Sequence, residues 1–508
     1  MPLRRWLEQS TVLPGAGDLR RVALNAENWR ACATDAAAAG ARLLAFWADA
    51  TPRAAVSAAL HVGQSMLVLS LELSGSSPEY PGLADLFPAA ARMQRAAADL
   101  CGVRAQDADR RPWLRHAAWP AEFLPLAEGS APPPPHRPLD AYEFVRVTGE
   151  GVHEIAVGPV HAGTIEPGHF RFSVVGEKVL RLEERLGYTH KGIERLFRQL
   201  PARDGQRLAA RVCGDSTVAF SWAYCQACES IAATNIPPRA QWLRAAGLEA
   251  ERIANHLGDL GALGNDAGFA FGLAQFSRLK ERWLRATARA FGRRYLFDYV
   301  VPGGVAADST PAALGELAAC ATEIDVAARE LRTIYDEHAG VRDRFAGAGR
   351  VAPELALRLG LCGLAGRASG QAFDLRVDLP SSPYEALAVR KASSEEGDVM
   401  ARVAVRFEEL GESLRLIGEI ARRIPAGSVL DGVPAPAAGF GIGLVEGWRG
   451  PVVVALSTCA DGGILRCHPH DPSWQNWPVL EHAIIGNIVP DFPLINKSFN
   501  LAYSGHDL

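Results

Sequence analysis

The stretch SAPPPPHRP, at residues 130–138, decides how the chain is divided into domains. Four consecutive prolines favour a stiff polyproline II conformation and fit neither a helix interior nor a central strand. We therefore place a proline-rich linker at residues 126–140. The linker separates a small domain at residues 1–125 from a larger one at residues 141–508.

The smaller domain is predicted to be of the α/β type. Ala37–Phe46 is rich in alanine and apolar throughout, which favours a helix. Met66–Leu73 (MLVLSLEL) is typical of a partly buried strand. Ala89–Leu100 has a high helix propensity, and Gly102 is placed to cap the end of that helix.

The larger domain combines a few strands with many helices. Strands are predicted at Val152–Val160, Phe170–Val175 and Val452–Leu456. The chain between Glu177 and Arg423 is expected to be mostly helical, and Asn487–Leu508 looks like an aromatic loop without a helix. The predicted class is α+β, with a mainly helical larger domain that contains a small antiparallel sheet.

Composition excludes several classes of protein. The chain has 508 residues, with 53 Lys and Arg against 57 Asp and Glu, and a net charge of −4. This balance argues against a nucleic-acid binder, which needs a clustered basic face. Nine cysteines in a long chain favour a reducing cytosolic setting over a disulfide scaffold. Without a signal segment or a run of 18 apolar residues, we expect a soluble protein or one held at a membrane by partners.

Two short motifs carry polar residues next to glycines. The turn GPVHAGTIEPGHFRF, at residues 158–172, contains His161, Glu166 and His169. Its glycines let side chains approach a ligand closely, although a polar hairpin loop explains the same pattern. His190 and Glu194 lie four residues apart, which fits one helix face, a glycine cap or a surface feature.

Cysteines occur in two nearby stretches, CGDS at residues 213–216 and the pair Cys225 and Cys228. A Cys-x-x-Cys pair is a common metal or redox element. This pair, however, lies in the apolar run AFSWAYCQACES, where cysteine usually acts as a small buried hydrophobe. Structural zinc and iron–sulfur sites use four such ligands, and no second pair exists. We predict that the pair holds no metal.

Arginines and acids alternate in two further regions. The helix predicted at residues 241–260 places Glu249, Arg252 and His256 on one face. A glycine-rich stretch carries Arg367 and leads to Asp374. Because a buried Arg–carboxylate network is costly unless it is fully hydrogen-bonded, such groups mark a specified interior. A structural network, a solvated ion-pair face and the lining of a proton path remain open alternatives.

Together, the segments of the larger domain resemble the large subunit of group 4 membrane-bound [NiFe]-hydrogenases, and equally the quinone-site subunit of respiratory complex I. The matching stretches are GPVHAGTIEPGHFRF, RLGYTHKGIERLF, RVCGDSTVAFSWAYCQACE, IPPRAQWLRAAGLEAERIANHLGDLG, VPGGV, GLAGRASGQAFDLR, EEGDVMARVAVRFEEL, GLVEGWRGPV and NIVPDFPLINKSFNL. The first 125 residues resemble the small peripheral-arm subunit of complex I, through YPGLADLFP, ARMQR and RPWLRH. The resemblance thus implies a fusion, in the order typical of the hydrogenase-4 and formate-hydrogenlyase branch.

The resemblance implies a binuclear metal site that this sequence does not complete. Active family members hold nickel with two Cys-x-x-Cys pairs, since soft thiolates suit the metals. The first pair aligns with Cys213 and Ser216, and the second with Ala502 and Gly505. Three of the four thiolates are absent. We therefore expect no nickel, no [NiFe] centre and no hydrogen chemistry.

The implied quinone site is also incomplete. The headgroup tyrosine of the complex I subunit follows an arginine by three residues, and that place is Gly214 after Arg211. The headgroup histidine falls in the hairpin loop, where either Glu166 or His169 fits the space. Quinone therefore stays an open candidate ligand.

The residues expected to line the family's cavity are six candidate catalytic groups, Glu166, His190, Glu194, Asp215, Arg367 and Asp374, and three candidate cofactor-binding groups, His161, His169 and Cys213. No metal ligand is assigned. A carboxyl group desolvated in such a cavity is expected to have a raised pKa that suits it to relay protons.

The resemblance implies a subunit of a membrane-associated, complex I-related oxidoreductase that couples electron transfer to proton or ion movement. Its expected partners are an iron–sulfur small subunit, which holds the cluster, and antiporter-like membrane subunits, with no nucleic acid. We expect it on the cytoplasmic side of the inner membrane. A non-catalytic structural or assembly subunit of an ion- or inorganic-carbon-transporting complex is the alternative, and an active [NiFe] hydrogenase is disfavoured. No dinucleotide-binding glycine motif follows a predicted strand, so direct NAD binding is not expected.

Overall fold

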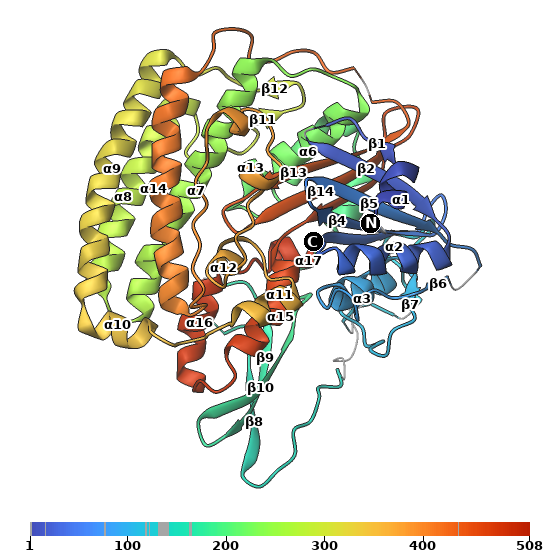
Figure 1. Ribbon diagram of the computed structural model, residues 1–508, viewed down its shortest axis with the longest axis horizontal. Coiled ribbons are helices and arrows are strands. Elements are labelled where there is room, and N and C mark those ends of the chain that lie inside the picture. Colours follow the sequence, from blue (N-terminus) through green and yellow to red (C-terminus); the bar gives the residue numbers. More distant parts are fainter. Residues whose placement is uncertain are drawn as a thin grey trace.

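The computed structural model describes residues 3–15, 17–75, 78–116, 119–120, 122–130, 142–161, 165–434 and 436–508. Most of the linker predicted at residues 126–140 lies outside these ranges, so the linker remains a prediction. Figure 1 shows a bundle of long helices on one side of the molecule and the N-terminal sheet on the other.

The N-terminal residues form a five-stranded sheet in the order β1-β2-β5-β4-β3. Its strands are β1 (Thr11–Val12), β2 (Asp18–Leu24), β3 (Arg42–Asp49), β4 (Ala55–Val62) and β5 (Ser65–Glu72). Strands β2 and β5 are parallel, and the other neighbours are antiparallel. Because side chains alternate along a strand, Leu67 and Leu69 share a core with helices α2 (Ala26–Ala38) and α3 (Ala90–Cys101), whereas Val68 faces the rest of the molecule.

Two of the predicted N-terminal elements correspond to β5 and α3, and a third is wrong. Helix α3 ends at Gly102, whose φ of 73° lies in the left-handed region, as predicted for a cap. The helix predicted at Ala37–Phe46 is instead the end of α2, a turn at Gly40 with φ 77°, and strand β3. A short apolar run suits either a helix or a strand buried on both faces, and pairing with β4 decides for the strand.

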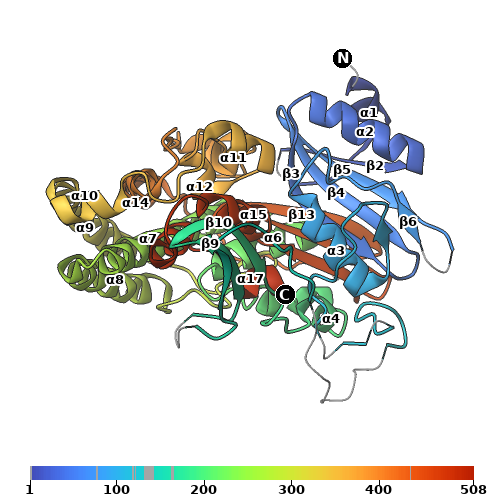
Figure 2. The same ribbon diagram turned by 90° about the horizontal axis from the view of Figure 1, so that it is seen from below.

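Two further antiparallel sheets belong to the larger part of the chain. Strands β8 (Val152–Val157), β9 (His169–Val175) and β10 (Lys178–Arg185) form a sheet that projects from the body in Figure 1. Strands β13 (Gly439–Glu446), β14 (Pro451–Thr458) and β15 (Ile464–His470) form a central sheet. One face of the N-terminal sheet shares an apolar core with this central sheet, through residues such as Trp47, Val68 and Val453. Figure 2 shows the two sheets side by side.

Long helices make up most of the remainder. They are α6 (Thr217–Ile231), α7 (Pro238–Asp266), α8 (Ala270–Phe291), α9 (Pro311–Glu337) and α14 (Val399–Arg423). The last four run alongside one another in Figure 1, while α6 covers the central sheet. The region expected to be mostly helical therefore is so, apart from β10 and the short pair of strands near Val300.

The shorter elements connect these layers. They are α1 (Arg4–Gln9), β6 (Glu79–Tyr80), β7 (Arg104–Ala105), α4 (Ile193–Phe197), α5 (Gln206–Ala209), β11 (Val300–Val301), β12 (Gly304–Val305), α10 (Ala339–Phe345), α11 (Pro353–Leu359), α12 (Gly363–Arg367), α13 (Leu375–Asp378) and α15 (Ser473–Ala483), with 3-10 turns at Ala202–Asp204, Tyr384–Ala386 and Val489–Asp491. No helix in the described ranges is long and apolar enough to cross a membrane.

The C-terminal segment corrects a second prediction, because it is not a loop. It contains α16 (Phe492–Phe499) and α17 (Ser504–Asp507), separated by Asn500 with φ 45°. Residues 501–508 are all buried. The segment is too short for a helical pattern to be visible in the sequence, and its helices are stabilised by packing into the core.

Candidate functional site

The CGDS loop lies at the start of α6 and contacts an arginine from the turn after β13. Arg449 Nη1 donates to Asp215 Oδ1 at 2.6 Å and lies 3.3 Å from Ser216 Oγ and 3.6 Å from Cys213 Sγ. The Cys213 thiol in turn donates to Asp215 Oδ1 at 3.0 Å. Cys213 and Arg449 are buried, whereas the Asp215 side chain is 37% exposed. We call Cys213, Asp215, Ser216 and Arg449 the central cluster.

The C-terminal segment closes the other side of the central cluster. Arg449 Nε donates to the carbonyl oxygen of Asn500, and Asp471, which follows β15, lies beside Gly505. A Cβ atom placed on Gly505 would lie 2.5 Å from Asp471 Oδ2. Burial raises the pKa of Asp471 against the effect of Arg449. The space at residue 505 is therefore taken by a carboxyl group.

These residues do not fit the binuclear metal site that the family resemblance implies. Cys213 is the one thiol among the four ligand positions that the resemblance implies, and burial together with Asp215 raises its pKa well above the usual range. The Arg449 cation beside the sulfur opposes a bound metal cation, and Asp471 fills the place of a side chain at Gly505. In the described part of the chain, no three His, Cys, Asp or Glu side chains are arranged to hold a metal ion.

Glu194, at the start of α4, lies in a second polar group. Its Oε1 accepts from Arg466 Nη1 and contacts His468 Nδ1, both at 2.7 Å, and Arg466 also pairs with Asp49 of β3 at 3.2 Å. A cavity of about 20 Å³ lies between Glu194, His468 and apolar side chains of β3 and α3. By volume it is large enough for one water molecule. This group joins the N-terminal sheet to the larger part of the chain.

The pKa of Glu194 corrects the expectation of a raised value. Burial acts to raise it, but the Arg466 charge and the His468 contact outweigh burial and hold the pKa at about 2. For the same reason Arg449 holds the pKa of Asp215 at about 2, and Arg376 with Arg367 lowers that of Asp374. The expectation overlooked the guanidinium groups, which become neighbours only through the fold.

Three other predicted residues lie around the C-terminal segment. Glu166 Oε2 accepts from the backbone N–H of Ser504 at 3.0 Å, and the His161 ring lies 6.5 Å from that of Tyr503. His190 Nδ1 lies 2.8 Å from the carbonyl oxygen of Asp507. The His169 ring lies 3.4 Å, at its Nδ1 atom, from the carbonyl oxygen of Gly158, and its centroid is 5.3 Å from that of Phe144.

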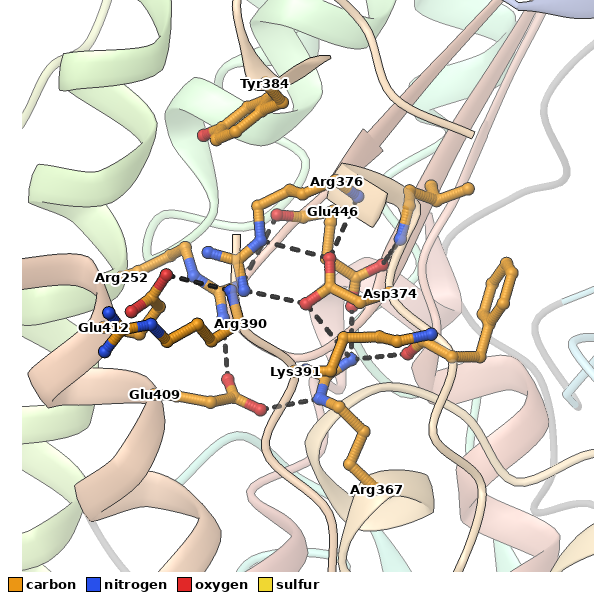
Figure 3. A network of polar contacts seen from close by, with 12 residues as sticks. Arg252, Arg367, Asp374, Arg376, Tyr384, Arg390, Lys391, Glu409, Glu412 and Glu446 are labelled. Atoms are coloured by element: carbon orange, nitrogen blue, oxygen red, sulfur yellow. Dashed lines mark hydrogen bonds and ion pairs between the residues drawn. The ribbon is translucent and has the colours of Figure 1, made fainter. Parts of the chain in front are cut away.

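The two remaining predicted residues, Arg367 and Asp374, belong to a buried charge network between the helical bundle and the central sheet (Figure 3). The network has three arginines and four acids: Arg252, Arg367, Arg376, Glu249, Asp374, Glu409 and Glu446. Every member is at most 3% exposed. The predicted face of α7 with Glu249, Arg252 and His256 is therefore a buried network and not a solvated ion-pair face.

Sequence reasoning missed Arg449, Asp471 and Glu446, the residues that connect these groups. Glu446 ends β13 and Arg449 lies in the turn that follows, so the charge network and the central cluster are three residues apart in sequence. A charged residue between glycines at a strand end was the available signal for Arg449. Nothing local marks Asp471, because its neighbour Gly505 is distant in sequence.

Comparisons with known proteins place this geometry in a family. A family model described as the 49 Kd subunit of respiratory-chain NADH dehydrogenase matches residues 266–438. Formate hydrogenlyase subunit 5 of Escherichia coli is 30% identical over 449 residues, which cover 87% of this chain and 79% of that protein. Hydrogenase-4 component G of the same organism is 28% identical, over 87% of this chain and 78% of its own length.

A solved structure is similar over the larger part of the chain. It is a chain in the membrane-bound sulfane sulfur reductase, an archaeal respiratory membrane complex, with a TM-score of 0.66 and 25% identity, covering 72% of this chain and all of that one. The mixed helical and sheet fold agrees with the predicted large-subunit-like class. The chain therefore belongs to the family of formate hydrogenlyase subunit 5 and hydrogenase-4 component G, which is related to the 49 Kd subunit of respiratory NADH dehydrogenase.

Proposed function

We propose that this chain is a subunit of a membrane-associated oxidoreductase related to complex I and hydrogenase-4, and that it couples electron transfer to proton or ion movement without a [NiFe] centre. The observation that carries the proposal is the content of the family's metal pocket. Arg449 lies where a cation would meet Cys213, and the Asp471 carboxyl lies at Gly505. Relatives with respiratory or hydrogenase names support the coupling of electron transfer to ion movement.

We propose different roles for the candidate catalytic residues according to their contacts. Asp215 and Glu194 stay ionised at neutral pH because their pKa values are near 2, so they position Arg449 and Arg466 and do not relay protons. Glu166 and His190 hold the C-terminal segment against the central cluster.

Arg367 and Asp374 act within the charge network. Cys213 is the candidate cofactor-contacting group of the central cluster, and His161 and His169 are those of the hairpin loop. Quinone is the candidate small-molecule ligand, and nickel is not expected.

In this proposal the chain is peripheral and binds its partners on the cytoplasmic side of the inner membrane. An iron–sulfur small subunit delivers electrons, and antiporter-like membrane subunits move the ion. The N-terminal residues take the place of the small peripheral-arm subunit, fused through the proline-rich linker. Their extensive packing on the central sheet supports a fixed position for that part.

The test is purification of the intact assembly, followed by elemental analysis and a quinone-reduction assay. We expect iron without stoichiometric nickel, and quinone reduction that depends on the central cluster. Asp215→Asn, which leaves Arg449 uncompensated, should lower turnover by at least about tenfold, or about 1.4 kcal/mol of activation free energy. Asp298→Asn is the matched control, since Asp298 pairs with Arg211 outside the cluster and should change turnover by less than about twofold.

The same filled pocket also supports a second candidate, a structural or assembly subunit without redox chemistry. In that case Asp215→Asn and Asp298→Asn would leave electron transfer in the assembly equally unaffected. Removal of the chain would still prevent the assembly from forming. Stoichiometric nickel in the purified assembly would contradict both candidates.

A further inference from the structure

We propose that the charge network stores one exchangeable proton, and that Glu446 carries it. The inference rests on the number and contacts of the buried charges and does not depend on the proposed electron transfer.

The network contains more acids than arginines. Three guanidinium groups face four carboxyl groups at distances of at most 3.9 Å, and all seven groups are at most 3% exposed. Arginine keeps its proton inside proteins, so the cations cannot adjust. An uncompensated negative charge in a buried site is costly, and the carboxyl group that bears it is neutralised instead. One proton is therefore expected on one of the four acids.

The contacts of the four acids indicate which one carries the proton. Glu409 contacts two guanidinium groups, with 2.6 Å to Arg367 Nε and 2.7 Å to Arg252 Nη2. Arg376 forms two side-chain hydrogen bonds with Asp374, at 3.1 and 2.7 Å. Each of these acids is well compensated as a carboxylate.

The other two acids, Glu249 and Glu446, differ from each other in their hydrogen-bond donors. Glu249 accepts from Arg376 and, at 2.6 Å, from the hydroxyl of Tyr384. Glu446 accepts from a single guanidinium nitrogen, Arg367 Nη1 at 2.8 Å, and from the backbone N–H of Leu375 at 3.1 Å. Glu446 is thus the least compensated acid of the network.

Several titratable groups face Glu446 and its partners. Burial, reinforced by Asp374, raises the pKa of Glu446 to about 7, and the charges of Arg367 and Arg252 reduce this effect. His256 of α7 lies with its Nε2 atom 3.3 Å from Glu409 Oε2, but burial lowers its pKa, so it is a poorer proton acceptor.

The charged groups around the network complete its surroundings. Arg406 and Asp259 pair with each other at 2.9 Å, and the Arg406 charge acts on His256. Cys362 near Glu446 is a buried thiol with a raised pKa. At the edge of the network, Lys391 pairs with Asp378 at 2.9 Å, and this pair is about one quarter exposed. Asp378 accepts from the backbone N–H of Asp374, so a partly exposed ion pair lies next to the network.

Glu446 lies close to the central cluster, so its protonation can respond to a change of charge there. Glu446 ends β13, and the following turn carries Arg449 of the central cluster. Arg252 donates to the carbonyl oxygen of Gly447 in that turn, and His256 meets the edge of Trp448. We expect a change of charge at the central cluster to act on Glu446, because only Gly447 and Trp448, both buried, lie between Glu446 and Arg449.

The experiment measures protonated carboxyl groups in the full-length chain by infrared spectroscopy in D₂O, with ¹³C-labelled glutamate to separate Glu from Asp. We expect a glutamic acid band that disappears with a midpoint at a pH of about 7. Glu446→Gln should remove this component, because the amide retains the shape but cannot titrate. Glu412→Gln is the matched control, since Glu412 lies on α14 with Arg415 as its partner outside the network. The Glu412→Gln variant should keep the glutamic acid band that titrates near pH 7.

A second variant keeps the inference testable if Glu446→Gln does not fold. Glu251 is another buried glutamate, whose pKa burial raises to about 8 against the N–H groups of Val218 and Ala219. In Glu251→Gln, a glutamic acid band that still titrates near pH 7 shows that Glu251 is not its source, as the proposal requires. A Glu446→Gln spectrum identical to the unsubstituted one, or the absence of any glutamic acid titrating near pH 7 in Glu251→Gln, would overturn it.

Discussion

Buried arginines determine the protonation state of the acids beside them in this protein. Asp215 and Glu194 both lie in places where burial acts to raise a carboxyl pKa, yet both remain strong acids because a guanidinium group faces them. Glu446, with less compensation, has its pKa raised to about 7. Glu194 and Glu446 each accept from one guanidinium nitrogen, so the other charged group beside each carboxyl group, His468 at Glu194 and Asp374 at Glu446, separates the fixed charge from the group that can exchange a proton.

Arg449→Met should destabilise the fold, because it leaves the Asp215 carboxylate without its guanidinium partner. Breaking a fully buried pair costs about 3–5 kcal/mol, but Asp215 is 37% exposed, so we expect the unfolding free energy to fall by about 1–3 kcal/mol. Urea denaturation at neutral pH measures this. The double variant Arg449→Met/Asp215→Asn should recover part of the loss, and a double variant as unstable as the sum of both single variants would contradict the pairing.

Arg466→Met should cost more, about 3–5 kcal/mol, because Glu194 is 3% exposed. The pKa of Glu194 in the fold, about 2, lies below its usual 4.5, so its charge stabilises the fold above about pH 4.5 and less as the pH falls towards 2. The variant should lose this acid-dependent part of its stability, as seen by denaturation at a series of pH values. Arg53→Met is the control, because Arg53 and Glu72 form an exposed pair worth about 0–1 kcal/mol.

Among the contacts between elements, two glycines let strand β13 lie directly on helix α6. Cβ atoms on Gly443 and Gly441 would lie 1.8 and 2.2 Å from the carbonyl oxygens of Ala223 and Ala227. Two residues of strand advance about 6.8 Å and four residues of helix about 6 Å, so the spacings match. This contact fixes the start of α6, and with it the CGDS loop, against the turn that carries Arg449.

Gly443→Ala should therefore destabilise the protein by about 1–3 kcal/mol or more, because the added methyl overlaps the helix backbone. Gly315→Ala is a control for which the opposite effect on stability is expected. Gly315 lies exposed within α9 with no described atom near its added Cβ, and alanine should stabilise the helix by about 0.5–1 kcal/mol. Thermal denaturation of both variants checks the pair, and equal melting temperatures would contradict the argument.

At the scale of the whole molecule, the N-terminal sheet and the central sheet share one apolar core. Trp47 of β3 stacks on Phe440 and His468, with ring centroids 6.4 and 5.7 Å apart. His468 in turn contacts Glu194, so the interface between the two parts includes one of the polar groups of the candidate site. We expect the two parts to unfold together.

Trp47→Ala should lower the unfolding free energy by about 3–5 kcal/mol while leaving a single calorimetric transition. Trp47 is 3% exposed, so its removal leaves a cavity at the interface. Phe271→Ala is the control, since Phe271 is 48% exposed and its loss should cost little. Two separated transitions in the unsubstituted protein would contradict a shared core.

Sequence reasoning succeeded where local pattern was strong and failed where packing chose between alternatives. The helix at Ala89–Leu100 and its glycine cap could be predicted because propensity and cap agree. Ala37–Phe46 was misjudged because an apolar run does not distinguish a buried strand from a helix. The short C-terminal helices, which close the central cluster, have no stability of their own and depend on packing.

The family and the mixed fold class could be inferred from residue identity and order alone, and the family resemblance implies that three of four thiol ligands are missing. Which charges meet depends on how the chain folds. Arg449 reaches Asp215 across 234 residues of chain, and Arg376 reaches Glu249 across 127. The protonation of a carboxyl group depends on burial and on charges within a few ångströms, and neither property is local in sequence.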